Sequence, residues 1–129
     1  MDRLHRVLLV DDDPDQLLLL GSLLEREHYL VTQARDGLEG LSTMASQSFD
    51  IVVTDVSMPN MDGLDFAREL KRRLDRTPVV LLTAGVEPID FSAKSYRADA
   101  FCLKQNLRGS LLPKMKALLE QEDQESATV

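Results

Sequence analysis

The stretch I-V-V-T-D-V-S-M-P-N-M-D-G, residues 51–63, sets an acidic side chain at the end of a short apolar run. Ile51–Thr54 has the length and the β-branched composition of a strand buried on both faces, as in a parallel sheet. Asp55 follows directly, and a carboxylate at the end of a buried strand is costly unless it is paired or bound to a metal ion. The stretch therefore predicts both a strand of a parallel sheet and a functional carboxylate at its end.

Four further apolar runs of this kind lie along the chain. Three are compact, and the one at 29–34 is weaker and partly alternating, as expected nearer the edge of a sheet. They are Val7–Val10, Tyr29–Ala34, Val79–Leu82 and Ala100–Leu103. Between the runs, apolar residues recur at helical spacing. This alternation predicts an α/β fold in which a doubly wound, five-stranded parallel sheet carries helices on both faces.

Four helical segments are clear in the sequence and a fifth is weak. The clear apolar stripes span Leu17–Leu24, Leu38–Met44, Leu64–Leu74 and Leu111–Leu119. Asp13 is expected to cap the first of these helices, because Pro14 suits its first position and Gln16 comes three residues after the cap. The segment 87–97 has a poor apolar stripe, so we expect it to be short or mobile. Residues 120–129 have four acids and no bases, which favours an acidic flexible tail or the start of a linker after a domain at 1–119.

The composition excludes several classes of protein. A length of 129 residues suits one domain, and 22 Asp+Glu against 15 Lys+Arg give a formal net charge of −7. Such a charge is poorly suited to binding nucleic acid or an anionic membrane, and the basic stretch 71–76 is expected to be a solvated helix face. Cys102 is the only cysteine, so no internal disulfide forms. Neither a signal peptide nor a membrane span is recognisable, so we expect a cytoplasmic protein.

The residues that directly follow the predicted strands carry the chemistry. In open α/β sheets, ligands bind at the carboxyl ends of the strands, where the strand order reverses. Asp11 and Asp12 follow the first strand, Asp55 the third, Thr83 the fourth and Lys104 the fifth. We therefore expect three carboxylates, a hydroxyl and an ammonium group to meet at one end of the sheet.

This combination of side chains suits phosphoryl transfer. The carboxylates of Asp11, Asp12 and Asp55 repel one another unless a cation lies between them, and Mg²⁺ prefers such oxygen ligands. Asp55 could be a metal ligand only, or also a nucleophile that forms an acyl phosphate. Lys104 and Thr83 favour the second role, because an ammonium and a hydroxyl can bind the oxygens of a phosphoryl group.

The same residues resemble the receiver domain of two-component response regulators, in order and at similar spacing from about Arg6 to Leu119. The stretch from Asp55 to Gly63 is its most specific signature. The motifs are Val10-Asp11-Asp12, Asp55 with Met58-Pro59-Asn60-Met61-Asp62-Gly63, Leu82-Thr83-Ala84 and Phe101-Cys102-Leu103-Lys104. The resemblance implies a flavodoxin-like (CheY-like) fold with strand order 2-1-3-4-5.

The resemblance also implies a reaction and a cofactor. Asp55 would accept a phosphoryl group from a sensor histidine kinase or a histidine phosphotransfer protein. Asp12 and Asp55 would bind Mg²⁺ directly, the backbone carbonyl of Ser57 would be a third ligand, and Asp11 would act largely through water. The domain would catalyse its own phosphorylation and dephosphorylation without being a turnover enzyme.

Output is implied to depend on protein contacts. Thr83 and Lys104 would bind the phosphoryl oxygens, and Phe101 aligns with the switch aromatic of the family, although a plain core aromatic explains it equally well. Movement of Thr83 and Phe101 would remodel the face made by the fourth helix, fifth strand and fifth helix, to which a downstream protein binds. The domain is expected to be a monomer or a weak, phosphorylation-dependent homodimer without direct contact to nucleic acid or membrane.

Three positions depart from the pattern of the family. Gln105 stands where a proline usually follows the lysine, which puts the loop and the aim of Lys104 in question. Arg97 stands near a position that is commonly glycine and would be strained at positive φ. Pro113 falls in the last helix, and it fits the first turn if that helix starts near Ser110.

Two other functions compete with this interpretation. A phosphatase of the haloacid dehalogenase type would use Asp11, Asp13, Thr83 and Lys104, but the next acid after Lys104 is Glu120, and the 55–63 stretch would be unexplained. A receiver-like binding module that is never phosphorylated is the other alternative, and Gln105 weakly favours it.

Overall fold

The computed structural model describes residues 4–86, 89, 96 and 98–127, with side chains described as far as residue 124. Our expectations of a short or mobile helix at 87–97, and of strain at Arg97, lie outside the described residues except for Ile89 and Tyr96. Within the described part of the chain, no helix is both long and apolar enough to cross a membrane.

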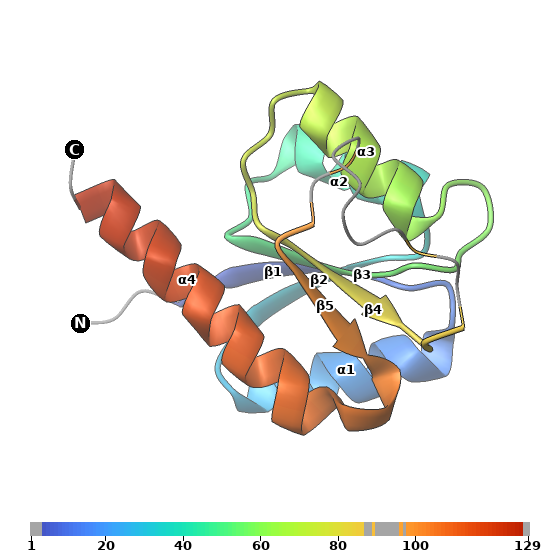
Figure 1. Cartoon of the computed structure of the whole chain (residues 1–129), viewed down its shortest axis with the longest axis horizontal. Helices are drawn as coiled ribbons and strands as arrows, with labels where there is room; N and C mark the ends of the chain where they lie inside the picture. The colour runs from blue at the N-terminus through green and yellow to red at the C-terminus, as the bar shows by residue number, and fades with distance from the viewer. Residues whose placement is uncertain (1–3, 87–88, 90–95, 97, 128–129) are drawn as a thin grey trace.

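Five parallel strands form one sheet in the order β2-β1-β3-β4-β5, as predicted (Figure 1). The strands are β1 (Arg6–Val10), β2 (Leu30–Ala34), β3 (Ile51–Asp55), β4 (Val79–Thr83) and β5 (Ala100–Leu103). The order reverses beside β1, because the chain first adds β2 on one side and then β3 on the other. The carboxyl ends of β1 and β3 are therefore neighbours, at the place where ligands bind in sheets of this kind.

Helices cover both faces of the sheet, as Figure 1 shows. They are α1 (Pro14–Arg26), α2 (Gly37–Ser46), α3 (Gly63–Arg72) and α4 (Leu112–Ala127). Val7 and Leu9 of β1 pack in one core cluster with α1 and α4 residues, while Leu8 and Val10 pack in the other with α2 and α3 residues. Alternate residues of a strand point to opposite faces, so a strand between two helical layers must be apolar throughout. This is why β1, β3 and β4 were recognisable as continuous apolar runs.

Each of the first three helices begins at an aspartate. A carboxylate oxygen at this position accepts a hydrogen bond from one of the free N–H groups of the first helical turn. The cap predicted at Asp13 is confirmed, whereas the caps of α2 and α3 were not predicted. Asp13, Asp36 and Asp62 accept from the backbone N–H groups of Asp15, Glu39 and Asp65 at 2.9, 2.8 and 2.8 Å.

Two further helical turns, which the sequence did not predict, precede the last α-helix. Helical structure begins directly after β5, with a 3₁₀ turn at Lys104–Asn106 and a π-helical turn at Leu107–Leu111 that leads into α4. The regular α-helix begins at Leu112, close to the predicted start near Ser110, and Pro113 lies in its first turn as expected. A π turn is wider than an α turn, and it lies just before Pro113, which has no N–H to donate and would crowd a regular α-helix.

The expectation of an unstructured tail from residue 120 is wrong for residues 120–127, which continue α4. Glu and Gln are good helix formers, and no Gly or Pro follows Pro113 to end the helix. Leu119 is buried in the core, and Asp123 Oδ2 lies 3.2 Å from His5 Nε2. These contacts tie the last turns of α4 to the start of β1, although the end of the helix projects past the sheet (Figure 1).

Leu74, assigned above to the apolar stripe of the third helix, is 85% exposed and has a φ of 58°. It follows Arg73, the residue that caps the C-terminus of α3. Its N–H donates to the carbonyl of Lys71, and the N–H of Asp75 donates to the carbonyl of Leu70, both at 3.0 Å. These two bonds define a Schellman motif, in which glycine is the usual residue at the left-handed position.

Replacing Leu74 with Gly should stabilise the domain by up to about 1 kcal/mol, because it removes the strain of a branched side chain at positive φ. The midpoint of urea unfolding measures this change. Leu74→Ala is the matched control, since it removes the exposed side chain but keeps the strain. Equal stability of the Gly variant and the wild type would contradict the prediction.

Candidate functional site

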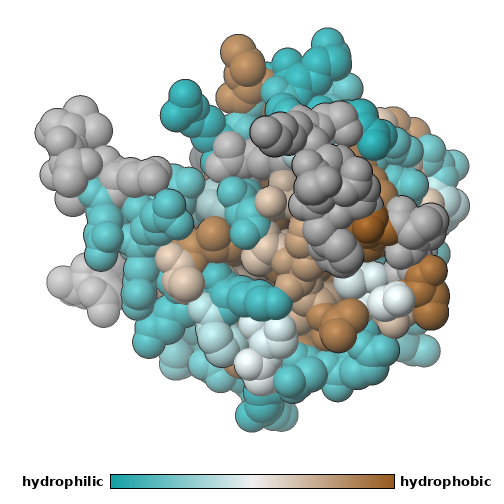
Figure 2. Space-filling model, in the orientation of Figure 1, coloured by the Kyte–Doolittle hydropathy of each residue, from teal (hydrophilic) through white to brown (hydrophobic). Residues whose placement is uncertain are grey.

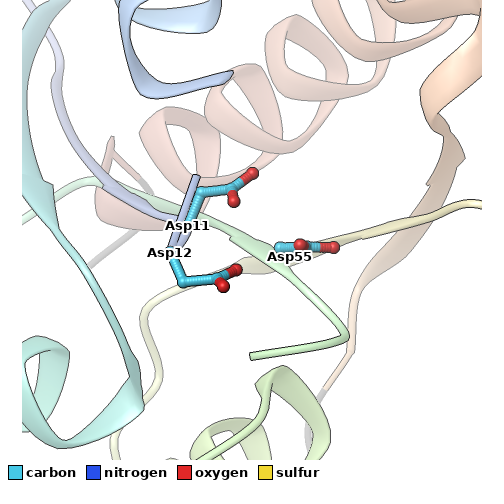
Figure 3. A group of neighbouring side chains, drawn as sticks. All are labelled: Asp11, Asp12 and Asp55. Carbon is cyan, nitrogen blue, oxygen red and sulfur yellow. The ribbon is translucent and has the colours of Figure 1, made fainter. Parts of the chain in front are cut away.

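The structure brings the three predicted acids together at the carboxyl ends of β1 and β3 (Figure 3). One carboxylate oxygen from each of Asp11, Asp12 and Asp55 lies within 4.8 Å of the others. Asp11 and Asp55 are 1% and 3% exposed, whereas Asp12 faces solvent. Two of the acids thus lie in the body of the protein, and the third lies at the mouth of the site.

Two oxygens of this acid cluster have no hydrogen-bond partner within the described part of the chain. Asp11 Oδ1 accepts from the N–H of Asp13 at 3.0 Å, but Asp11 Oδ2 is unpaired. Asp55 Oδ2 pairs with Lys104 Nζ at 3.0 Å, but Asp55 Oδ1 is unpaired. Buried polar atoms are normally satisfied. Two unsatisfied carboxylate oxygens beside a third carboxylate fit a hard divalent cation such as Mg²⁺.

Burial perturbs the protonation of both buried acids. It raises the pKa of Asp11 to about 6, and the nearby charge of Asp55 acts in the same direction, while the N–H of Asp13 and the Lys104 ammonium oppose them. The pKa of Asp55 is also raised, mainly by burial, although the hydrogen bond from Lys104 opposes this effect. The ionised cluster is therefore less favourable in the folded protein than in the unfolded chain.

Lys104 points into the acid cluster despite the substitution that follows it. It opens the 3₁₀ turn after β5, and its side chain is partly exposed. The described residues contain no cis peptide bond, so Gln105 follows Lys104 through a trans bond. The doubt about the aim of Lys104 is thus resolved, since its ammonium group reaches Asp55.

Thr83 is the last residue of β4. It follows Leu82, which is paired with Asp55 of β3 in the sheet. The residue is 3% exposed, and its hydroxyl oxygen accepts the N–H of Gly85 at 2.9 Å. Gly85 has a φ of 88°, a conformation that glycine adopts without strain. This hydrogen bond ties the Thr83 side chain to the loop that leaves the sheet.

The two remaining candidates lie where the sequence predicts, but with less direct contact. Phe101 is half-buried and packs against the core cluster on the α2 and α3 side of the sheet. Its carbonyl accepts a hydrogen bond from Lys114 Nζ on α4. Ser57 is exposed and follows Val56, whose N–H donates to the carbonyl of Leu82 at 3.0 Å.

The loop after Asp55 packs closely on the strand that precedes it. A Cβ at Gly63 would lie 2.1 Å from the backbone oxygen of Asp55, and the N–H of Gly63 donates to the carbonyl of Val56 at 2.8 Å. Only glycine allows this approach. This steric requirement explains why the 55–63 stretch ends in a glycine.

Sequence reasoning missed a second anchor of this loop. Asn60, at a φ of 66°, donates from Nδ2 to Asp36 Oδ2 at 2.8 Å, and the N–H of Gly37 donates to the carbonyl of Met61 at 3.0 Å. Asp36 thus caps α2 and also holds the loop that follows Asp55. An Asp-Gly pair before a helical stripe signals the cap, but no local signal reveals the contact with Asn60.

A family model described as the response regulator receiver domain matches residues 7–116. The chain belongs to the response regulator receiver family. Response regulator MprA of Mycobacterium ulcerans is 37% identical over 131 residues, which cover 95% of this chain and 54% of MprA. MprA of Mycobacterium avium is 36% identical over 134 residues, with 96% and 57% covered. The receiver chain thus spans about half the length of these curated relatives.

Solved structures agree with this assignment. TrrA from Thermotoga maritima, crystallised in complex with Mg²⁺-BeF, is 33% identical with a TM-score of 0.79, and 89% of this chain and 99% of TrrA are covered. A CheY-like receiver domain protein from Methanospirillum hungatei is 29% identical with a TM-score of 0.84, with 95% and 99% covered. The resemblance seen in the sequence is confirmed, as is the CheY-like fold. The competing phosphatase and binding-module interpretations are not favoured.

Replacing Gly63 with Ala should lower the free energy of unfolding by about 3 kcal/mol, because the new methyl group would collide with the Asp55 backbone and the loop would have to move. Urea denaturation measures the loss. Gly21→Ala is the matched control, since a Cβ there would meet only the end of the Gln33 side chain, at 3.0 Å. If the two variants unfold at the same denaturant concentration, the close approach of Gly63 does not limit stability.

Proposed function

We propose that this receiver domain accepts a phosphoryl group on Asp55 from a phosphohistidine of a sensor kinase or a histidine phosphotransfer protein. One observation carries the proposal. The carboxylate of Asp55 is almost fully buried, one of its oxygens pairs with Lys104, and the acid pair Asp11 and Asp12 lies beside it. A buried carboxylate with a fixed cation on one side and acids on the other is arranged to take on a phosphoryl group, not merely to stabilise the fold.

In the proposed reaction, a carboxylate oxygen of Asp55 attacks the phosphorus atom of phosphohistidine. A new P–O bond forms while the P–N bond breaks, and its electron pair leaves with the imidazole nitrogen. Lys104 lies where its ammonium can neutralise a phosphoryl oxygen, and the Thr83 hydroxyl can donate to another while its oxygen accepts the N–H of Gly85. Hydrolysis of the acyl phosphate later restores Asp55, so the domain modifies itself without turning over a separate substrate.

Mg²⁺ is the cofactor that we assign to this site. Asp12, Asp55 and the Ser57 carbonyl would bind it directly, and Asp11 would act largely through water. Bound there, the ion would offset the charge of the carboxylates and of the phosphoryl oxygens. The two unpaired oxygens of Asp11 and Asp55 support the assignment, as does the Mg²⁺-BeF complex of TrrA.

We assign output to the face around β5. In the family this face comprises the fourth helix, the fifth strand and the fifth helix, and the last two are β5 and α4 here. Figure 2 shows apolar atoms gathered over β5 beside the hydrophilic end of α4, and Leu103 of β5 is 51% exposed. Thr83 and Phe101 would switch this face, through which a downstream protein would bind. We take the receiver domain to be cytoplasmic, monomeric or weakly dimeric, and without contact to nucleic acid.

Incubation with Mg²⁺ and acetyl phosphate should add the mass of one phosphoryl group to the wild-type protein, as measured by intact-mass spectrometry. Asp55→Asn should gain nothing, because an amide oxygen is a poor nucleophile. Asp65→Asn is a control aspartate on the surface of α3, and it should behave as the wild type. A wild-type protein that gains no mass, or an Asp55→Asn variant that still does, would refute the proposal.

Mg²⁺ should raise the melting temperature more at a pH well above 6 than well below it. The pKa of Asp11 is raised from 3.8 to about 6, so the metal-free fold loses stability as the pH rises through this window. Cation binding needs the ionised carboxylates, and it contributes about 2.7 kcal/mol at a hundredfold excess over Kd. Thermal unfolding with and without Mg²⁺ across this pH range measures the difference.

Two variants sharpen this test. Asp55→Asn should melt above the wild type without metal, because it removes a charge whose burial opposes folding. Asp12→Asn should change the metal-free melting temperature little, since Asp12 is exposed, but it should reduce the gain from Mg²⁺. A metal-free Asp55→Asn variant that melts below the wild type would show that the pair with Lys104 outweighs the cost of burial.

A further inference from the structure

Gln105 joins the two loops that carry the phosphoryl-binding groups. Its side-chain nitrogen Nε2 donates to the backbone carbonyl of Ala84 at 3.1 Å. Ala84 directly follows Thr83, and Gln105 directly follows Lys104. One side-chain hydrogen bond thus links the end of β4 to the turn after β5, next to both residues that would hold the phosphoryl oxygens.

Each end of this hydrogen bond lies in a tightly shaped turn. On the β4 side, the Thr83 hydroxyl accepts the N–H of Gly85, so Ala84 lies inside a short ring closed by that bond. On the β5 side, Lys104 and Gln105 belong to one 3₁₀ turn. A displacement of the Ala84 carbonyl or of the Gln105 side chain therefore also shifts the Thr83 hydroxyl and the Lys104 backbone.

We propose that Gln105 is a positioning residue for phosphoryl transfer. Through its hydrogen bond to Ala84, it sets the distance between the turn that carries Lys104 and the loop that carries Thr83. The inference rests on the proposed function of Asp55 as phosphoryl acceptor, and it assigns to Gln105 a role in the rate of that reaction. Gln105 would act through Lys104 and Thr83, without binding the phosphoryl group itself.

The physical reason lies in the geometry that phosphoryl transfer needs. The charge that develops on the phosphoryl oxygens is stabilised only by donors already in place, and small misplacements of such donors slow the reaction. Lys104 reaches Asp55 from a strand at the edge of the sheet, whereas Thr83 belongs to the next strand inward. A link between the two loops keeps both donors on the same reacting group.

The size of the effect is limited, because the bond lies at the surface. An exposed neutral hydrogen bond contributes a modest free energy. Its loss should therefore raise the activation free energy only slightly and slow phosphorylation by about fivefold. Binding of Mg²⁺ should be unchanged, because Asp11 and Asp12 follow β1 and Asp55 ends β3, outside the two turns that Gln105 joins. A slower reaction with unchanged affinity for the metal separates positioning from general damage.

The test uses Gln105→Met, which keeps the length of the side chain but has no donor. Gln121→Met is the matched control, at an exposed position of α4 away from the site. The measurements are the phosphorylation rate with acetyl phosphate at saturating Mg²⁺, the Kd of Mg²⁺, the affinity for beryllofluoride as a phosphoryl analogue, and the amide NMR shift of Gly85.

Gln105→Met should phosphorylate about fivefold more slowly and bind beryllofluoride more weakly, with a shifted Gly85 amide and an unchanged Kd for Mg²⁺. Gln121→Met should match the wild type throughout. Wild-type rates in Gln105→Met would overturn the inference, as would a loss of Mg²⁺ binding equal to the loss of rate. A wild-type protein that is neither phosphorylated nor bound by beryllofluoride would instead remove the proposed function on which the inference rests.

Discussion

The repulsion among the carboxylates of Asp11, Asp12 and Asp55 is the constraint around which this domain is built. Two of the three are almost fully buried, and their raised pKa values show that the fold holds them against their preference for water. A parallel sheet can bring these acids together because the carboxyl ends of adjacent strands lie side by side at one end of the sheet. Burial of the apolar residues on both faces of β1 and β3 contributes folding free energy that offsets the cost of burying the carboxylates.

Several local features act on that cluster from different sides. Gly63 lets the loop after Asp55 return against its own strand, and Asp36 holds the far end of that loop through Asn60. Lys104 approaches from the edge strand and partly offsets the buried charge of Asp55. The contacts of Gly63 and Asn60 restrict the loop that follows Asp55, and the ion pair with Lys104 holds the Asp55 carboxylate. Such preorganisation is what a reaction based on charge stabilisation requires.

The sequence predicted the strands and the site for one shared reason. Strands buried on both faces are continuous apolar runs, so their ends are sharp, and residues such as Asp55, Thr83 and Lys104 stand out directly after them. The contacts that it did not predict are of another kind. The bond between Asn60 and Asp36 joins residues far apart in the chain, and the extension of α4 depends on the burial of Leu119 and a contact of Asp123 with His5. Neither contact has a local pattern from which to infer it.

Position in the fold, not charge alone, separates the acid cluster of Asp11, Asp12 and Asp55 from the acids of α4. The protein has a net charge of −7, and its acidic residues cluster in two places, at the strand ends and at 120–125 on α4. Glu120 and Asp123 are exposed, so water screens them and their repulsion costs the helix little. Asp11 and Asp55 lack that screening, so their repulsion favours the binding of a cation between them. Composition counts both sets alike, and only their places in the fold distinguish them.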